Sequence, residues 1–163
     1  MITKKSGFTL VELLMVMGIM GLLMVILFQV FGAILDMKLR SEATTAVAQD
    51  SRYLISRLTY DISRSSDITL PLAGGSGNTL ILVIDGVDYV YELNGTTLKL
   101  SVGGGASQAL TGIGTKITSI VFTHFADIGN KKSVQIVLNI APTTIQQGGT
   151  PGERTLTTTV VTR

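Results

Sequence analysis

The chain has 163 residues, too few for a large second domain, and it contains no cysteine, which excludes a disulfide framework. Its formal net charge is +2 and depends on Lys4 and Lys5, because without these two the basic and acidic side chains are equal in number. A neutral body lacks the electrostatic footprint of a general nucleic-acid-binding protein, so we expect no nucleic-acid partner.

An apolar segment runs from Phe8 to Leu35, and Glu12 is its single charged residue. The run exceeds both the apolar part of a secretory signal, about 7 to 15 residues, and the roughly 20 residues that cross a bilayer as a helix. It therefore predicts a retained transmembrane helix over residues 8–35. Inserting a charged side chain in the bilayer core costs about 2.5 to 3.5 kcal/mol on insertion scales. We therefore expect Glu12 to have a partner of opposite charge or a functional role. The alternative is that Glu12 snorkels to the cytoplasmic interface as an ordinary helix-end charge.

The residues around the start of this helix form a specific combination. Lys4 and Lys5 precede Gly7, the aromatic Phe8 follows, and Glu12 comes four residues later, within the unbroken apolar segment. This combination resembles the prepilin signal of type IV pilins and type II secretion pseudopilins. The resemblance implies that a membrane-embedded prepilin peptidase cuts after Gly7 on the cytoplasmic side, and that the new amine of Phe8 is methylated.

We expect Glu12 to set the register between assembled subunits. Cleavage would place a cationic amine on Phe8, about 6 Å along the helix from Glu12. A helix cannot easily fold its own terminus back onto that side chain, so the amine of a neighbouring subunit is the more natural partner. Pairing two groups that are each costly in lipid would favour one axial stagger. Gly18 and Gly21 favour close helix packing, or alternatively mark a point of local bending.

Beyond Leu35 the pattern stays helical and becomes amphipathic. Apolar residues recur at spacings of three, four and seven, and neither glycine nor proline occurs in residues 33–70. We therefore predict one helix from Phe8 to about Ser65, with residues 36–66 as the amphipathic continuation. The predicted buried stripe consists of Leu39, Ala43, Val47, Leu54, Leu58 and Ile62.

Residues 67–163 are patterned as β-strands. Thr79–Asp85 is a continuous apolar run, which predicts a central strand covered on both faces. Asp85-Gly86 and Asn94-Gly95 are tight-turn signals. The first precedes a run of alternating apolar and polar residues, Val87–Leu93, and the second precedes a similar run, Thr97–Val102. These features predict an antiparallel meander.

A second strand pair is predicted further along the chain, at Lys116–Phe125 and Ser133–Ala141, with alternate apolar residues of the latter on one face. Thr155–Thr162 is rich in β-branched residues and is expected to close the sheet as its last strand. Gly74–Asn78 and Pro142–Glu153 are expected loops. The predicted fold class is α+β: a long N-terminal helix whose distal half packs against one twisted antiparallel sheet.

No combination of residues predicts catalysis. His124 is the single histidine and lies in a predicted strand, so we expect a packed histidine and not a catalytic base. Asp85, Asp88 and Asp127 lack the spacing of an EF-hand, and turn and strand-surface roles are expected for them. The tyrosines are expected in the core or on a sheet face: Tyr53, Tyr60, Tyr89 and Tyr91. We therefore predict no enzyme activity, catalytic residue, metal ligand, cofactor or small-molecule substrate.

The resemblance implies a structural subunit of a type IV pilus or a type II secretion pseudopilus. Ser51–Ile62 and the all-β body resemble minor pilins and minor pseudopilins. The implied partners are the prepilin peptidase, other pilin or pseudopilin subunits and an inner-membrane assembly platform. The implied location is a single pass through the cytoplasmic (inner) membrane with the C-terminal domain outside the cytoplasm, followed by a cell-surface or periplasmic filament.

Three other hypotheses stay open. The chain could be a membrane-anchored extracytoplasmic binding module that keeps residues 1–7. It could also be a membrane-tethered hydrolase, which would need acidic or Ser/His groups converging in space. A DNA-uptake pseudopilus, serving competence, is a variant of the filament hypothesis.

Overall fold

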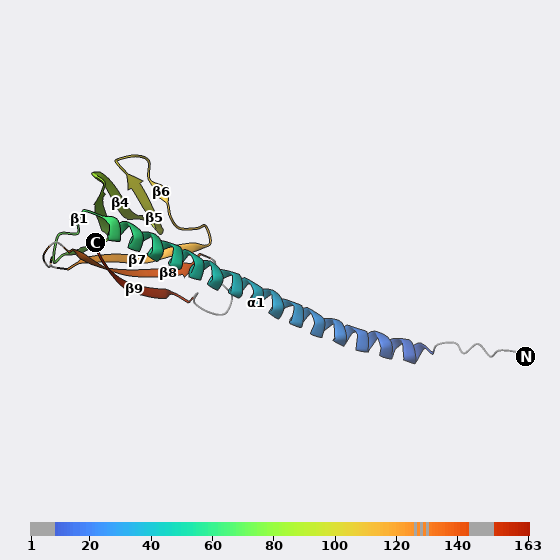
Figure 1. Ribbon diagram of the computed structural model, residues 1–163. Coiled ribbons are helices and arrows are strands. Elements are labelled where there is room, and N and C mark those ends of the chain that lie inside the picture. The colour runs from blue at the N-terminus through green and yellow to red at the C-terminus, as the bar shows by residue number, and fades with distance from the viewer. Residues whose placement is uncertain (1–8, 126, 128, 130, 144–151) are drawn as a thin grey trace, which may run out of the picture. The chain divides into compact units, whose positions relative to one another are not determined.

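The computed structural model of the chain describes residues 9–125, 127, 129, 131–143 and 152–163. Within these residues a long helix precedes a series of strands (Figure 1). The elements are α1 (Leu10–Arg64), β1 (Asp67–Leu70), β2 (Ser76–Gly77), β3 (Thr79–Ile84), β4 (Val87–Asn94), β5 (Thr97–Val102), β6 (Gln108–Ala109), β7 (Thr115–His124), β8 (Ser133–Pro142) and β9 (Arg154–Val161). The chain divides into two compact units, Met1–Arg40 and Ser41–Arg163, and α1 contributes to both.

The helix α1 ends within one residue of its predicted end. The backbone N–H of Ser65 donates to the carbonyl of Ile62 (3.1 Å), and the Ser65 hydroxyl donates to the same oxygen (2.8 Å). These bonds satisfy one of the carbonyls that a helix end leaves without an intrahelical partner. The predicted start at Phe8 lies outside the described residues.

The second unit has two antiparallel sheets where the sequence predicted one. In the part of the chain that the structure describes, the first sheet has the order β1-β3-β4-β5-β6 and the second has the order β2-β7-β8-β9. The α+β class, with a long N-terminal helix packed against antiparallel strands, is confirmed. The division differs because turn residues specify only neighbouring strands, whereas sheet membership depends on pairing between distant segments.

The predicted meander is confirmed as β3, β4 and β5. Asp85 (φ 52°) and Gly86 (φ 77°) join β3 to β4, and two successive residues with positive φ match the twist of a tight hairpin. β3 lies between β1 and β4, so the prediction of a central strand is confirmed. One face of β3 is buried and the other is half-buried, so the expected full cover of both faces was wrong. Short strands β1, β2 and β6 were not predicted, and β2 lies within the expected loop at 74–78.

The second sheet follows the predicted strand pair closely. β7 and β8 pair from Thr115 opposite Pro142 to His124 opposite Val134. Alternate side chains of β8 are fully buried, as predicted: Val134, Ile136, Leu138 and Ile140. β9 pairs with β8 and is the last strand of its sheet, also as predicted. The expected loop at 142–153 lies largely outside the described residues.

One hydrophobic core joins α1 to both sheets of the second unit. Figure 1 shows the last turns of α1 lying along the strands. Val47, Leu54, Leu58 and Ile62 form the buried stripe of the helix, and they belong to one cluster with side chains from both sheets. The stripe starts later than predicted, because Leu39 is 53% exposed. Ala43 is half-buried.

Two polar residues, Ser51 and Asp61, are also buried on this face of α1. Asp61 is fully buried and accepts hydrogen bonds from Arg57 Nε (2.8 Å) and from the hydroxyl of Tyr91 on β4. Burial, followed by the hydrogen bond to Asp61, raises the pKa of Tyr91 above its ordinary value. Hydrogen bonding to Tyr91, together with the Asp61 charge, raises the pKa of Arg57. This cluster fixes the helix to the first sheet through charge-assisted bonds.

Candidate assembly site on the N-terminal helix

The first turn of α1 has its own capping interaction. Thr9 Oγ1 accepts a hydrogen bond from the backbone N–H of Glu12 (3.3 Å), and the Thr9 carbonyl accepts one from the N–H of Leu13 (3.1 Å). Threonine at the N-cap with glutamate three residues later is the sequence of a capping box. The Thr9–Glu12 spacing could have predicted this cap from the sequence, but was overlooked.

Glu12 lies in this first turn and is exposed. Among the described residues no side chain forms an ion pair or hydrogen bond with its carboxylate. A carboxylate at a helix N-terminus is stabilised by the helix dipole, typically by 0.3 to about 1 kcal/mol. The helix dipole therefore stabilises Glu12 at this position. Its carboxylate stays available to a group from outside the described chain.

The other predicted site residues, Lys4, Lys5, Gly7 and Phe8, lie outside the described residues. The proposed cleavage and methylation positions, and the distance from the Phe8 amine to Glu12, therefore stay predictions.

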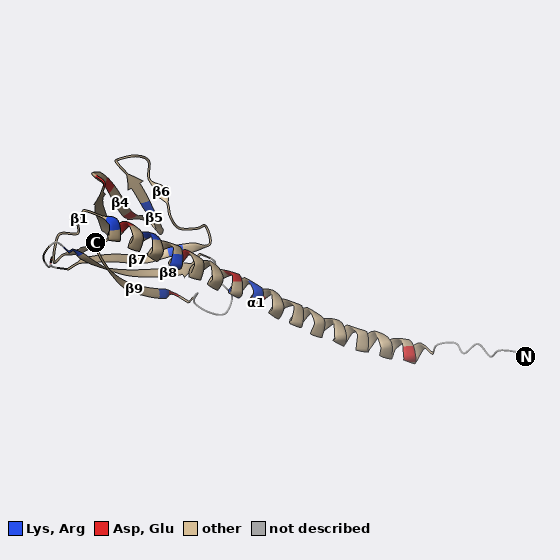
Figure 2. Cartoon of the chain, viewed as in Figure 1, with Lys and Arg blue, Asp and Glu red and all other residues tan. Residues whose placement is uncertain are grey.

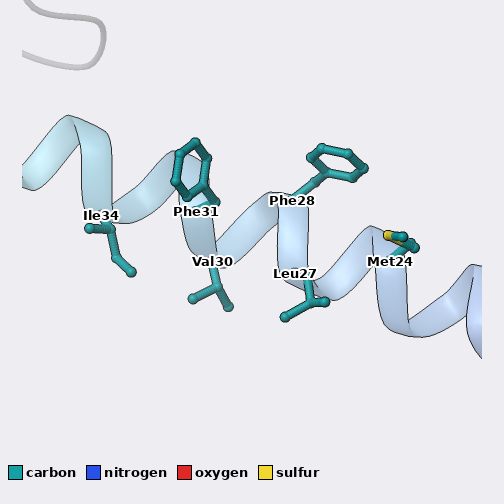
Figure 3. A pocket seen from close by; sticks show the side chains of 6 residues that line it. All are labelled: Met24, Leu27, Phe28, Val30, Phe31 and Ile34. Carbon is teal, nitrogen blue, oxygen red and sulfur yellow. The ribbon is translucent and has the colours of Figure 1, made fainter.

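Beyond Glu12 the helix presents an exposed apolar surface. Every residue from Thr9 to Glu42 is exposed, and Figure 2 shows one acidic band near the start of α1 followed by a long uncharged stretch. By length and composition α1 is able to cross a membrane. Its surface carries a shallow groove of 410 Å³, lined only by apolar side chains: Met24, Leu27, Phe28, Val30, Phe31 and Ile34. In Figure 3 Phe28 and Phe31 point to one side of the helix, and Leu27 and Val30 to the other.

Gly18 and Gly21 also lie on this surface, and no contact within the described chain requires a glycine at either position. A Cβ added at either position would meet no described atom within 4 Å outside the neighbouring helix backbone. Helices that pack against each other in a membrane often use small residues to let their backbones approach closely. Packing within the described chain does not account for these two glycines, whereas contact with another helix would.

The candidates for catalysis or metal binding occupy structural positions in the fold. His124 is buried; its Nδ1 lies 2.9 Å from the carbonyl oxygen of Pro71, and its Nε2 lies 3.0 Å from Asp127 Oδ1. The expectation of a packed histidine is confirmed. Asp85 lies in the β3–β4 turn and Asp88 is exposed on β4, also as expected. In the part of the chain that the structure describes, no three His, Cys, Asp or Glu side chains are grouped to hold a metal ion.

The tyrosines divide into two groups. Tyr91 is fully buried and Tyr89 is half-buried, as expected, but Tyr53 and Tyr60 are 51% and 57% exposed on α1. The prediction was wrong for these last two, because they lie on the helix face opposite the buried stripe. The guanidinium of Arg64 lies 5.1 Å from the centre of the Tyr60 ring and 5.9 Å from that of Tyr89, within cation–π range.

Comparison with known proteins agrees with the N-terminal features. The family described as "Prokaryotic N-terminal methylation motif" matches residues 2–28. No curated protein matches the chain, and no solved structure does. The matched segment contains Thr9 and Glu12 and most of the exposed apolar helix, and it points to a processed structural subunit anchored in the inner membrane. This motif, at the start of a long helix packed against antiparallel sheets, supports placing the protein in the type IV pilin and pseudopilin family.

Proposed function

We propose that the protein is a minor structural subunit of a type IV pilus or a type II secretion pseudopilus. The observation that carries the proposal is the N-terminal methylation motif over residues 2–28, followed by an exposed apolar helix whose single charge is Glu12. On this proposal residues 1–7 form a leader, residues 8–35 the transmembrane and filament-core helix, residues 36–66 its amphipathic continuation, and residues 67–163 the globular domain.

The proposed processing step uses the N-terminal residues. The peptidase cuts after Gly7, and the basic leader with Lys4 and Lys5 stays on the cytoplasmic side. The new amine of Phe8 is then methylated. A secondary or tertiary amine still binds a proton, so methylation leaves a cation that can pair with a carboxylate.

The proposed assembly step moves the apolar helix from lipid into a bundle of like helices. Glu12 would pair with the Phe8 amine of a neighbouring subunit, because its carboxylate has no partner among the described side chains. Gly18 and Gly21 would provide positions of close approach between helices, since nothing in the described chain occupies the space beside them. The partners are thus other pilin or pseudopilin subunits and the assembly platform that extracts the helix from the membrane.

The test is N-terminal mass analysis of the protein from its native membrane and from sheared surface material. We expect a mature chain that begins at methylated Phe8, present in the sheared fraction at low copy number relative to the main subunit. A chain that begins at Met1 and occurs only in the membrane would overturn the proposal and favour a membrane-anchored binding module.

The machine served by the filament is tested separately. Deletion of the gene should abolish motility or adhesion for a pilus, protein secretion for a secretion pseudopilus, or transformation for a DNA-uptake pseudopilus. Loss of none of these activities, with a filament of normal composition, would contradict a role in assembly.

A further inference from the structure

A second surface, far along the sequence from the N-terminal segment, has the features of a peptide-binding groove. It lies between the last part of α1 and strand β9, within the unit formed by Ser41–Arg163. Its volume is 250 Å³, and it is lined by Ser51, Arg52, Ile55, Ser56, Arg154 and Leu156. The groove thus has one helical wall and one wall formed by a strand at the edge of a sheet.

Within the described residues, one edge of that strand is open. β9 pairs with β8 along its whole length, from Arg154 opposite Ile140 to Val161 opposite Ser133, and no described strand pairs with its other edge. Alternate residues of a strand direct their N–H and C=O groups to opposite sides, so an open edge presents unpaired backbone donors and acceptors. The strand has eight residues and contains no proline, and Arg154 at its start is its only charged residue. The strand itself therefore lacks the prolines and central charges that discourage an incoming strand, and α1 meets the chain past the end of β9, where the backbone N–H of Arg163 donates to the carbonyl of Ser63 (3.2 Å).

The walls of the groove carry positive charge over an apolar base. Arg52 is exposed on α1 and Arg154 is exposed on β9, and neither forms an ion pair with a described residue. No acidic side chain lines the groove. Ile55 and Leu156 are half-buried and pack against the core, so they form a fixed apolar surface between the two arginines. The matching ligand has apolar side chains and at least one carboxylate.

We propose that this groove binds an extended polypeptide strand of another protein, which adds to the open edge of β9 and carries a carboxylate that pairs with Arg52 or Arg154. Backbone hydrogen bonds to β9 provide the affinity, and the arginines select acidic over basic sequences. The occupant is a strand and not a helix, because the unpaired groups on the β9 edge can be satisfied by an extended backbone. This inference does not rest on the filament role, since a pilin and a membrane-anchored binding module would use the groove in the same way.

The experiment selects ligands from a peptide library with the full chain in detergent. The peptides match β9 in length, with each position randomised over Val, Leu, Thr, Gly, Asp and Lys. We expect enrichment of alternating β-branched or apolar residues with aspartate at one or two fixed positions. Recovery of no sequence above background, or of lysine-rich sequences, would overturn the proposal.

Backbone methylation of an enriched peptide then tests the mode of binding. A strand added to an edge uses only one of its own two edges, so N-methylation at one set of alternate residues should abolish binding and methylation at the other set should have little effect. Equal effects of both sets would contradict strand addition.

Variants of the protein test the charge selection. Arg52→Gln and Arg154→Gln should each weaken binding of the acidic peptide by up to about fivefold, and less at high salt, as expected for partly exposed ion pairs. Lys131→Gln removes an exposed positive charge that does not line the groove, and should leave binding unchanged. Both arginine variants change exposed side chains and should keep the circular dichroism spectrum of the parent. If Lys131→Gln weakened peptide binding as much as the arginine variants do, binding would depend on net charge alone, and the proposed site would be overturned.

Discussion

At the scale of single residues, the first turn of α1 combines a cap with an unpaired charge. Thr9 satisfies the backbone N–H of Glu12, while the Glu12 side chain has no described partner. Capping and charge can therefore be separated by substitution. Replacing the capping threonine costs typically about 1 kcal/mol of helix stability, whereas losing the charge removes the proposed contact between subunits.

We predict that Glu12→Val still inserts in the membrane and is still processed, because cleavage depends on the leader and on Gly7 and Phe8. Incorporation into sheared filaments should fall by about tenfold or more, as expected when a desolvated charge pair worth over about 1.4 kcal/mol is lost. Quantitative immunoblots of membrane and sheared fractions measure this ratio. Thr9→Ala is the matched control and should keep most incorporation; normal incorporation of Glu12→Val would remove Glu12 from the assembly mechanism.

Tyr91 gives a prediction about alkaline pH. Its folded-state pKa is raised by burial and by the hydrogen bond to Asp61, while the unfolded chain titrates near the ordinary value of 10.0. Below that pH both states hold the proton and the contribution to stability is complete. As pH rises above about 10 only the unfolded state loses the proton, so the free energy of unfolding falls by up to about 1.4 kcal/mol per pH unit.

The measurement for Tyr91 is urea unfolding of the full chain in detergent at several pH values between about 8 and 11. Tyr91→Phe should be less stable at neutral pH, because it leaves Asp61 with fewer hydrogen bonds, and its stability should depend less on alkaline pH. Tyr60→Phe changes an exposed ring and should keep the parent's pH dependence. An unchanged alkaline slope in Tyr91→Phe would contradict the assignment.

At the scale of elements, α1 holds the loop between β6 and β7 through one carboxylate. Asp50 Oδ2 accepts hydrogen bonds from the backbone N–H of Gly112 (2.9 Å) and from the hydroxyl of Thr115. A Cβ on Gly112 would lie 2.9 Å from the same oxygen, closer than real Cβ contacts. An alanine at this position would therefore displace the Asp50 carboxylate from its hydrogen bonds to the loop.

We predict that Gly112→Ala lowers the free energy of unfolding by about 1 to 2 kcal/mol, because Asp50 must move and lose at least one of its bonds to the loop. Gly152→Ala is the control: an added Cβ there meets no described atom within 4 Å and φ is not positive, so its effect should stay within about 0.5 kcal/mol. Urea unfolding of both variants in detergent measures the difference. Equal effects would show that the contact with Asp50 does not determine the stability of this loop.

At the scale of the whole molecule, the buried core lies entirely in the second unit. Every described buried residue is at Val47 or beyond, and α1 supplies Val47, Leu54, Leu58 and Ile62 to one cluster with the strands. The exposed apolar part of α1 belongs to the other unit. The folding of the second unit should therefore not depend on residues 1–40.

We predict that a chain beginning at Ser41 folds without detergent and keeps a cooperative urea transition. A chain beginning at Thr59 loses Leu54 and Leu58, each worth about 2 to 5 kcal/mol as a buried leucine, and should not fold. Circular dichroism and the urea transition of both fragments provide the measurement. Failure of the longer fragment to fold would show that residues 1–40 are needed for folding.

Much of this architecture followed from local sequence patterns. The uninterrupted run without glycine or proline located the end of α1 to within one residue, and the turn residues at Asp85-Gly86 and Asn94-Gly95 located the β3–β5 meander. The N-terminal resemblance rested on a few residues in fixed order, and the family match covers the same segment. These signals are short-range, since helix periodicity and turn conformation depend on neighbouring residues.

The tertiary structure alone decided which strands share a sheet and which polar groups are buried. Nothing near β5 or β7 in the sequence encodes that they belong to different sheets, and the burial of Asp61 depends on Tyr91, thirty residues away. The same holds for the groove between α1 and β9, whose two arginines are about a hundred residues apart. The sequence by itself thus determined the elements, their order and the N-terminal signal, because each depends on local backbone preferences. The sheets, the buried charge and the groove depend on long-range contacts, which form only when the chain packs around one core.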